Sequence, residues 1–279
     1  MKYYDDNAEQ YYKNTINADP HELCLMFTDG ARRFLNKDIH NISVLDLGCG
    51  SARDSIYLSG EGFNVTGIDL SFKLLGHAVS SAINSDNGGA AESLTQTKRL
   101  TSLSDETDTA NATDGDSALR TLRPPCRAVD SLPSMASSTL RPPCRAVDSL
   151  PSMASSTLRP PCRAAFLCAD FTKLPFKDVS FDAVFAQASL LHVPKAKLAA
   201  VLNEVNRVMR PGGLIYLSLK EGAGESLDEK GRFFAYYDSE ELETEISNNG
   251  FKTVDFKRKA SRDGLNNVAI WLMYLALKV

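Results

Sequence analysis

The sequence predicts an α/β protein with a mainly parallel β-sheet and helices on both of its faces. Short apolar runs alternate with amphipathic helical stretches along most of the chain, and this alternation is typical of parallel sheets. Glycines and acidic residues follow the predicted strands at their carboxyl ends, where open α/β sheets bind ligands. The composition, with 43% hydrophobic and 24% charged residues, is that of a globular protein.

The first half of the predicted domain alternates strand and helix twice. Ser43–Leu47 is a compact apolar run of the kind found in buried strands, and the spacing over Ala52–Gly62 predicts a helix with Ile56 and Leu58 facing inward. Phe63–Leu70 reads as the second strand. Phe72–Ile83 follows as a helix, with Ser71 as its N-cap.

The second half continues the alternation and ends in a hairpin. The remaining strands are expected at Ala165–Ala169, Phe181–Ala186 and Leu214–Leu219. Helices are expected at Lys195–Met209, ended by Arg210-Pro211-Gly212-Gly213, and at Asp238–Asn249. The first of them places six apolar side chains on one face, those of Leu198, Val201, Leu202, Val205, Val208 and Met209. Phe251–Lys257 and Val268–Lys278 are predicted to form a terminal antiparallel pair, which brings the sheet to seven strands.

Residues 85–163 differ from the rest of the chain in composition. They contain none of its 23 aromatic residues and eight of its 12 prolines, and Thr121–Ser138 is repeated letter for letter in Thr139–Ser156. The repeat has a Pro-Pro pair and only scattered apolar residues, too few to offset the entropy of ordering. We expect a disordered low-complexity insertion between two halves of one domain, 1–84 and 164–279. In an alternative interpretation, its arginine-rich half touches an anionic partner.

Composition also excludes several classes of protein. The longest nearly pure apolar run, Val268 to Leu277, is ten residues, against the ~20 that a membrane-spanning helix needs. The amino terminus is too polar for a secretory signal peptide, and six cysteines are too few for a disulfide scaffold. A cytoplasmic protein without membrane contact is therefore expected. The net charge of −4 disfavours nucleic acid as a partner, and the oligomeric state stays open.

Two glycines and an aspartate lie at the ends of the first two strands. Gly48 and Gly50 let the backbone turn tightly and approach a ligand beside a helix amino terminus. A dinucleotide fingerprint would need glycine where Arg53 stands, so a NAD-dependent oxidoreductase is the weaker alternative. Asp69 ends the second strand. Its carboxylate suits the two hydroxyls of a ribose, although it would also suit a simple N-cap.

Asp170 and Phe171 follow the third strand. Together they offer an acceptor for an exocyclic amine and an aromatic surface for an adenine ring. Taken alone, the pair is better explained as a loop acid beside a core aromatic.

Considered together, four segments are far more specific than any one motif. VLDLGCGSARDS, VTGIDLS, FLCADFTKLPFKDVSFDAVFAQASLLHV and RVMRPGGLIYLSLKEG resemble successive motifs of class I S-adenosylmethionine-dependent methyltransferases. The resemblance covers Tyr3 to about Ile83 and Ala165 to Lys278. It implies a Rossmann-like three-layer α/β/α sandwich and S-adenosylmethionine as cofactor. The family's third loop glycine is replaced by Ala52, a small residue expected to keep the turn.

The resemblance also implies a set of cofactor-binding residues. Gly48 and Gly50 would lie against the methionine part, Asp46 would support the turn, and Asp69 would hold the ribose. Asp170 would take the adenine amino group with the help of Phe171, and Gln187 and Ala188 would flank the sulfonium. Tyr11 matches a lid position or, alternatively, is an ordinary aromatic on a helix surface. The full predicted set is Tyr11, Asp46, Gly48, Gly50, Arg53, Asp69, Leu70, Asp170, Phe171, Gln187 and Ala188.

The acceptor side carries weaker signals. His192 is a candidate base, or else packs a helix start, and positioning alone can supply much of the rate of a methyl transfer. No metal site is expected, because the four histidines are scattered and unpaired with cysteine. Arg232, Tyr236 and Tyr237 are candidate substrate contacts suited to a small molecule with an apolar body and an acid. In the alternative, their segment is a loop that covers the core.

These residues predict methyl transfer to an oxygen, nitrogen or sulfur atom of a small molecule. Where amide- and adenine-N6-methylating relatives carry an Asn/Asp-Pro-Pro run, this chain has Gln187-Ala188-Ser189-Leu190, and the Pro-Cys nucleophile of cytosine-C5 enzymes is absent. The alternative outside the enzymes is a catalytically impaired relic that still binds the cofactor.

Overall fold

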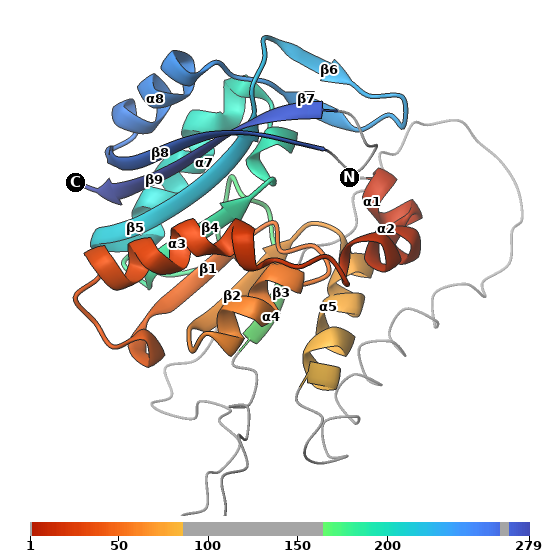
Figure 1. Cartoon of the computed structure of the whole chain (residues 1–279), viewed down its shortest axis with the longest axis horizontal. Helices are drawn as coiled ribbons and strands as arrows, with labels where there is room; N and C mark the ends of the chain where they lie inside the picture. The colour runs from red at the N-terminus through yellow and green to blue at the C-terminus, as the bar shows by residue number, and fades with distance from the viewer. Residues whose placement is uncertain (1, 86–163, 263–267) are drawn as a thin grey trace, which may run out of the picture. The chain divides into compact units, whose positions relative to one another are not determined.

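A computed structural model describes residues 2–85, 164–262 and 268–279, whose main sheet has seven strands (Figure 1). The strand order is β3-β2-β1-β4-β5-β9-β8, and neighbouring strands are parallel except where β9 pairs antiparallel with β5 and β8. The bounds are β1 (Ser43–Leu47), β2 (Asn64–Asp69), β3 (Ala164–Cys168), β4 (Phe181–Gln187), β5 (Met209–Lys220), β8 (Phe251–Arg262) and β9 (Val268–Lys278). The predicted fold class and the terminal antiparallel pair are confirmed.

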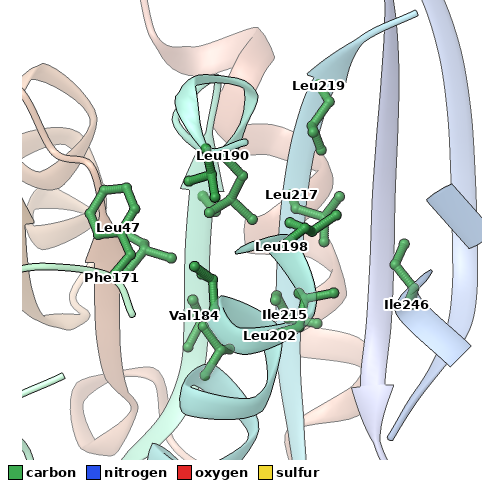
Figure 2. Packing of buried hydrophobic residues seen from close by; sticks show 14 of the residues in the cluster. Leu47, Phe171, Val184, Leu190, Leu198, Leu202, Ile215, Leu217, Leu219 and Ile246 are labelled. Carbon is green, nitrogen blue, oxygen red and sulfur yellow. The ribbon is translucent and has the colours of Figure 1, made fainter. Parts of the chain in front are cut away.

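Alternating side chains of the central strands build two separate cores. On one face, Val44, Phe185 and Tyr216 pack with residues of α3 (His21–Phe34) and α4 (Arg53–Gly60). On the other face, Val184, Ile215 and Leu217 pack against α7 (Lys195–Val208), as Figure 2 shows, and α8 (Ser239–Asn248) adds Ile246. The sheet is therefore buried on both faces, which is why its central strands are almost wholly apolar.

The amino-terminal helices α1 (Lys2–Asp6) and α2 (Ala8–Thr15) rest on α5 (Phe72–Ser85) (Figure 1). The rings of Tyr12 and His77 stack with their centroids 4.6 Å apart. The Ser71 hydroxyl donates a hydrogen bond of 2.7 Å to Asp5 Oδ1. Because α5 follows β2, these contacts hold the start of the chain at the carboxyl ends of the parallel strands.

Three features differ from the sequence prediction. The segment Arg210–Gly213 is not a turn outside the sheet, because β5 begins at Met209 and runs through it with a register break opposite Phe181–Ala183. Helix α3 and the hairpin of β6 (Glu225–Leu227) and β7 (Phe233–Ala235) were not predicted. Two short 3₁₀ helices, η1 (Ile39–Asn41) and η2 (Leu190–His192), complete the described elements.

Helix α5 ends at Ser85 and β3 begins at Ala164, so the segment between them joins a helix to a strand, as expected. The predicted repeats and their predicted disorder lie outside the described residues. Residues on both sides of the segment contribute strands to the same sheet. Within the part of the chain that the structure describes, no helix combines the length and apolar character needed to cross a bilayer.

Candidate active site

A cavity of about 380 Å³ opens at the carboxyl ends of β1, β4 and β5, beneath α1 and α2. Residues far apart in the sequence line it, from the loop after β1, the end of β4, the end of β5, and β7 to β9. Eight of the residues predicted from the sequence are among them: Tyr11, Gly48, Gly50, Arg53, Gln187, Ala188, His192 and Arg232.

The loop after β1 has the backbone that its glycines predict. Gly48 has a φ of +86°, and a Cβ there would lie 2.4 Å from Cβ of Ser189, so no other residue fits. Gly50 has a φ of +54°, and a Cβ there would have only the Tyr11 ring nearby, 3.8 Å away. Ala52 adopts a φ of +69°, a left-handed conformation that costs alanine about 1 kcal/mol. The residue that replaces the third glycine therefore keeps the turn.

Asp46 lies beneath this loop and does not line the cavity. The hydroxyl of Ser55 donates a hydrogen bond of 2.5 Å to Asp46 Oδ2. Burial raises the pKa of the Asp46 carboxyl to about 8, although the Ser55 hydrogen bond acts in the opposite direction. The side chain thus joins β1 to α4 and supports the turn from inside the protein.

Asp69 ties the end of β2 to the glycine loop. The backbone N–H of Gly50 donates to its Oδ2 at 2.9 Å, and the N–H of Ser71 donates to its Oδ1 at 2.8 Å. Burial raises the pKa of Asp69, although these hydrogen bonds oppose the shift. The hydroxyl of Ser71 accepts the N–H of Leu74 at 3.3 Å, so Ser71 rather than Asp69 caps α5. Asp69 and Leu70 lie outside the cavity lining.

The end of β3 is less like the expected adenine site. Asp170 is exposed, and its Oδ1 accepts the N–H and the hydroxyl of Thr172, both at 2.8 Å. The Phe171 ring is buried in the core, and its Cζ would lie 3.3 Å from a Cβ on Gly48. Phe171 therefore packs beneath the glycine loop and offers no open ring face beside Asp170.

The end of β4 is held by β5. The hydroxyl of Tyr216 donates to Gln187 Oε1 at 2.6 Å, and the N–H of Ala188 donates to Ser218 Oγ at 2.9 Å. Ala188 has a φ of +50°, and strained backbone of this kind is enriched at functional sites. The sequence prediction did not include Tyr216 and Ser218. They are polar residues two positions apart on a strand that pairs with β4, and this spacing could have identified them.

His192 faces the cavity and bonds at both ring nitrogens. Nδ1 lies 2.7 Å from the carbonyl oxygen of Phe233, and Nε2 lies 2.7 Å from the hydroxyl of Tyr4. Since a carbonyl only accepts, Nδ1 carries the proton and Nε2 accepts from Tyr4. Burial lowers the pKa of His192 to about 4, so the ring is neutral near pH 7. Tyr4 was not predicted, since nothing in the sequence links it to a residue 188 positions away.

The far side of the cavity combines cations with aromatic rings. Arg232 lines it together with Phe234, Trp271 and Lys220. Phe234 belongs to the same predicted aromatic segment as Arg232, whereas Trp271 and Lys220 were not predicted. Tyr237 is buried in the core, and Tyr236 packs over Gly222. The structure thus places Arg232 at the cavity and the two tyrosines outside its lining.

Comparisons with known proteins agree with this geometry. A family model described as "Methyltransferase domain" matches residues 134–217, and one described as "Tellurite resistance protein TehB" matches residues 25–98. Each covers less than a third of the chain. A sterol 24-C-methyltransferase of Gibberella zeae is 47% identical over 49 residues, which are 18% of this chain and 12% of that protein. The chain thus matches about an eighth of the length of this curated relative.

Solved structures match over most of the chain. An S-adenosylmethionine-dependent methyltransferase from Methanosarcina mazei has a TM-score of 0.55 at 19% identity, over 89% of this chain and 96% of its own. Magnesium protoporphyrin IX methyltransferase of Synechocystis, solved with bound S-adenosylmethionine, has a TM-score of 0.55 at 14% identity, over 100% and 94%. Because the sequence identities are only 19% and 14%, these similarities establish the fold alone.

Proposed function

We propose that this chain, which has the fold and the motif matches of class I S-adenosylmethionine-dependent methyltransferases, transfers a methyl group from that cofactor to a small-molecule acceptor. The observation that carries the proposal is the joining of Gly50 and Asp69 at the ends of β1 and β2. This arrangement presents a close-approach loop and a carboxylate side by side, as an adenosyl ligand requires.

The residues present fit such a cofactor. A Cβ placed on Gly50 would have only the Tyr11 ring within 4 Å, which leaves room for a ligand against the backbone. Asp69 bears two carboxylate oxygens with further lone pairs, the acceptors that ribose hydroxyls need. We propose that Gly48 and Gly50 hold the methionine part, Asp69 and Leu70 the ribose, and Asp170 with the backbone of Phe171 the adenine. Gln187 and Ala188 would lie nearest the sulfonium, and Arg53 beside the methionine carboxylate.

When bound, S-adenosylmethionine supplies an electrophilic methyl group on a positively charged sulfur. The chain's own contribution is to position an acceptor in line with that group and to exclude water. Tyr4 and Tyr11 do the excluding, since both lie over the cavity from α1 and α2. Their ring centroids are 5.4 Å apart in an edge-to-face pair, which keeps the cover closed above the glycine loop.

His192 is the residue that would orient the acceptor. Its Nε2 lone pair receives the Tyr4 hydroxyl, and an acceptor O–H or N–H would replace that hydroxyl. With a pKa of about 4, the ring is a weak base, so it suits an acceptor whose proton leaves only as the methyl group arrives. We predict that His192→Asn lowers turnover by ~10²-fold while S-adenosylhomocysteine affinity stays within about twofold. Unchanged turnover per folded molecule would show that His192 only packs.

The partner of the chain is a small molecule under this proposal. We also propose a cytoplasmic location, supported by the free thiols of Cys24 and Cys49.

Calorimetric titration tests the proposal directly. S-adenosylmethionine and S-adenosylhomocysteine should both bind, whereas NAD should not, because Arg53 fills the place of a fingerprint glycine. Binding of NAD in preference to the adenosyl compounds would overturn the assignment. Binding of the adenosyl compounds, with no methylated product from a broad acceptor screen, would favour the relic.

A further inference from the structure

Tyr4 places a phenol group of the protein itself on the acceptor side of the cavity. Its hydroxyl donates to His192 Nε2 at 2.7 Å, and the two rings meet edge to face with centroids 5.3 Å apart and planes at 69°. The Tyr11 ring stands at 88° to the Tyr4 ring, with centroids 5.4 Å apart. All three residues line the cavity. Tyr4 thus occupies the position proposed above for the reacting group of the acceptor.

A second tyrosine–histidine pair in the chain has different surroundings. The hydroxyl of Tyr57 lies 2.6 Å from His21 Nδ1, with ring centroids 5.9 Å apart and planes at 70°. That hydrogen bond is exposed to solvent, and neither residue lines the cavity. The pair of Tyr4 and His192 instead combines a hydrogen-bond acceptor with the aromatic walls of a cavity, the two features that a bound phenol requires.

The neighbours of the Tyr4 hydroxyl favour an uncharged ligand. His192 is neutral, since its Nδ1 proton goes to the Phe233 carbonyl and its pKa is about 4. Arg232 also hydrogen bonds to Tyr4, and its charge is already paired with that of Asp228. Neither His192 nor Arg232 therefore needs a counter-ion, and a neutral hydroxyl that both donates and accepts suits this position.

Helix α1 has a construction that suits displacement of Tyr4. It has five residues, and α2 begins only after Asn7, whose φ of −118° and ψ of 18° interrupt the helix. A helix this short is marginal on its own. Outward rotation of α1 about Asn7 would remove Tyr4 and leave Tyr11, on α2, and His192, on η2, in place.

We infer that the methyl acceptor is a phenol, whose ring and hydroxyl take the place of those of Tyr4 against His192 and Tyr11. An aromatic hydroxyl reproduces both the hydrogen bond to Nε2 and the edge-to-face contacts, whereas an aliphatic alcohol or an aromatic ether reproduces only part of them. The Phe234 ring, centred 4.8 Å from that of His192, offers further aromatic surface to a larger phenol. The inference rests on the proposed function, because it names the acceptor class of that reaction.

Three isomeric probes test the inference: 4-methylphenol, which copies the tyrosine side chain, benzyl alcohol and anisole. Ligand-observed NMR measures their affinities for the full-length protein saturated with S-adenosylhomocysteine. We expect 4-methylphenol to bind at least tenfold more tightly than anisole, which cannot donate to His192 Nε2, and more tightly than benzyl alcohol, whose hydroxyl is one carbon away from the ring. Equal or tighter binding of either isomer would overturn the inference.

Variants then test whether the probe replaces Tyr4. Tyr4→Ala should raise the affinity for 4-methylphenol at least tenfold, because the probe no longer competes with an internal phenol. Tyr57→Ala, which opens the exposed tyrosine–histidine pair, is the matched control and should leave the affinity within about twofold. Adding His192→Leu to Tyr4→Ala should bring 4-methylphenol and anisole to within about twofold of each other, since leucine accepts no hydrogen bond. Unchanged affinity in Tyr4→Ala, with its fold verified by circular dichroism, would contradict the inference.

Calorimetry with S-adenosylhomocysteine separates this test from that of the proposed function. Cofactor binding without a preference for 4-methylphenol would overturn the phenol assignment alone. If S-adenosylhomocysteine does not bind, the proposed function fails, and the same titrations in cofactor-free protein still decide whether a phenol replaces Tyr4.

Discussion

At the scale of single residues, the site depends on carboxylates whose neighbours set their roles. Asp69 and Asp46 lie near the carboxyl ends of adjacent parallel strands. Asp69 accepts the backbone N–H of Gly50 in the glycine loop, whereas Asp46 lies beneath that loop and accepts the hydroxyl of Ser55. Asp69 keeps lone pairs for a ligand, whereas Asp46 is sealed in the core with Ser55. The two aspartates therefore lead to different predictions, one about cofactor affinity and one about the pH dependence of stability.

Replacing Asp69 with alanine removes the acceptors proposed for the ribose hydroxyls. We expect S-adenosylhomocysteine affinity to fall at least tenfold, since each charge-assisted hydrogen bond contributes ~1.5–3 kcal/mol at best. Calorimetry measures the loss, and circular dichroism shows that the fold persists. Asp29→Ala, on the exposed surface of α3, is the matched control and should bind normally. Full affinity in Asp69→Ala would rule out the ribose role.

Asp46 should make stability depend on pH. Its pKa rises to about 8 on folding from an ordinary value near 3.8, so between those values the folded chain holds a proton that the unfolded chain has released. The free energy of unfolding therefore falls as pH rises from about 4 to about 8. Asp46→Asn should flatten this dependence. Urea unfolding at pH 5 and pH 8 measures it, and an equal drop in both proteins would contradict the assignment.

At the scale of elements, α1 and α2 behave as a cover assembled on α5. They bury few residues of their own, and they supply Tyr4, Tyr11 and Thr15 to the cavity lining. Polar and aromatic contacts join them to α5 and to the residue before it, among them the Tyr12–His77 stack, the Tyr12–Ser81 hydrogen bond and the Asp5–Ser71 hydrogen bond. A cover held in this way contributes little to the stability of the sheet but closes the site.

Deleting residues 1–16 should therefore separate binding from folding. We expect the melting temperature to change by only a few degrees and S-adenosylhomocysteine to dissociate at least tenfold faster, because water and ligand then exchange freely over Gly50. Stopped-flow fluorescence of Trp271 follows the release. Lys13→Ala, which removes an exposed ion pair with Glu9 on α2, is the control. Unchanged dissociation in the shortened chain would show that the helices do not cover the cofactor.

At the scale of the whole molecule, the sheet joins residues that are distant in the sequence. Strand β2 pairs with β3 from Val65↔Ala164 to Asp69↔Cys168. Regular strand pairing therefore joins the parts of the chain that precede and follow residues 86–163. The two cores on either face of the sheet draw on both halves of the chain.

We predict that joining Ser85 to Ala164 through a short Gly-Ser linker keeps the fold and the cofactor site. Shortening a loop from ~80 to ~6 residues lowers its closure cost by about 2 kcal/mol, so the shortened chain should be more stable by up to that amount. Urea unfolding and S-adenosylhomocysteine titration give the two readouts. Unfolding or lost binding after the deletion would mean that residues 86–163 are structural.

The sequence by itself determined the alternation of strands and helices and the positions of Gly48, Gly50 and Asp69. These features are local, because burial periodicity and left-handed turns depend on neighbouring residues. At the loop after β3, tertiary packing decided where one side chain lies. The composition of Asp170-Phe171 does not reveal that the Phe171 ring turns into the core beneath Gly48.

Only the tertiary structure decided which side chains share the acceptor side. Tyr4 contacts His192 because α1 packs against α5. Lys220 contacts Phe234 because the β6–β7 hairpin folds back over the end of β5. Such contacts depend on how whole elements pack, and no spacing along the chain encodes them. The cofactor loop was predictable because one turn forms it, whereas the acceptor pocket was not because at least five separate elements converge to form it.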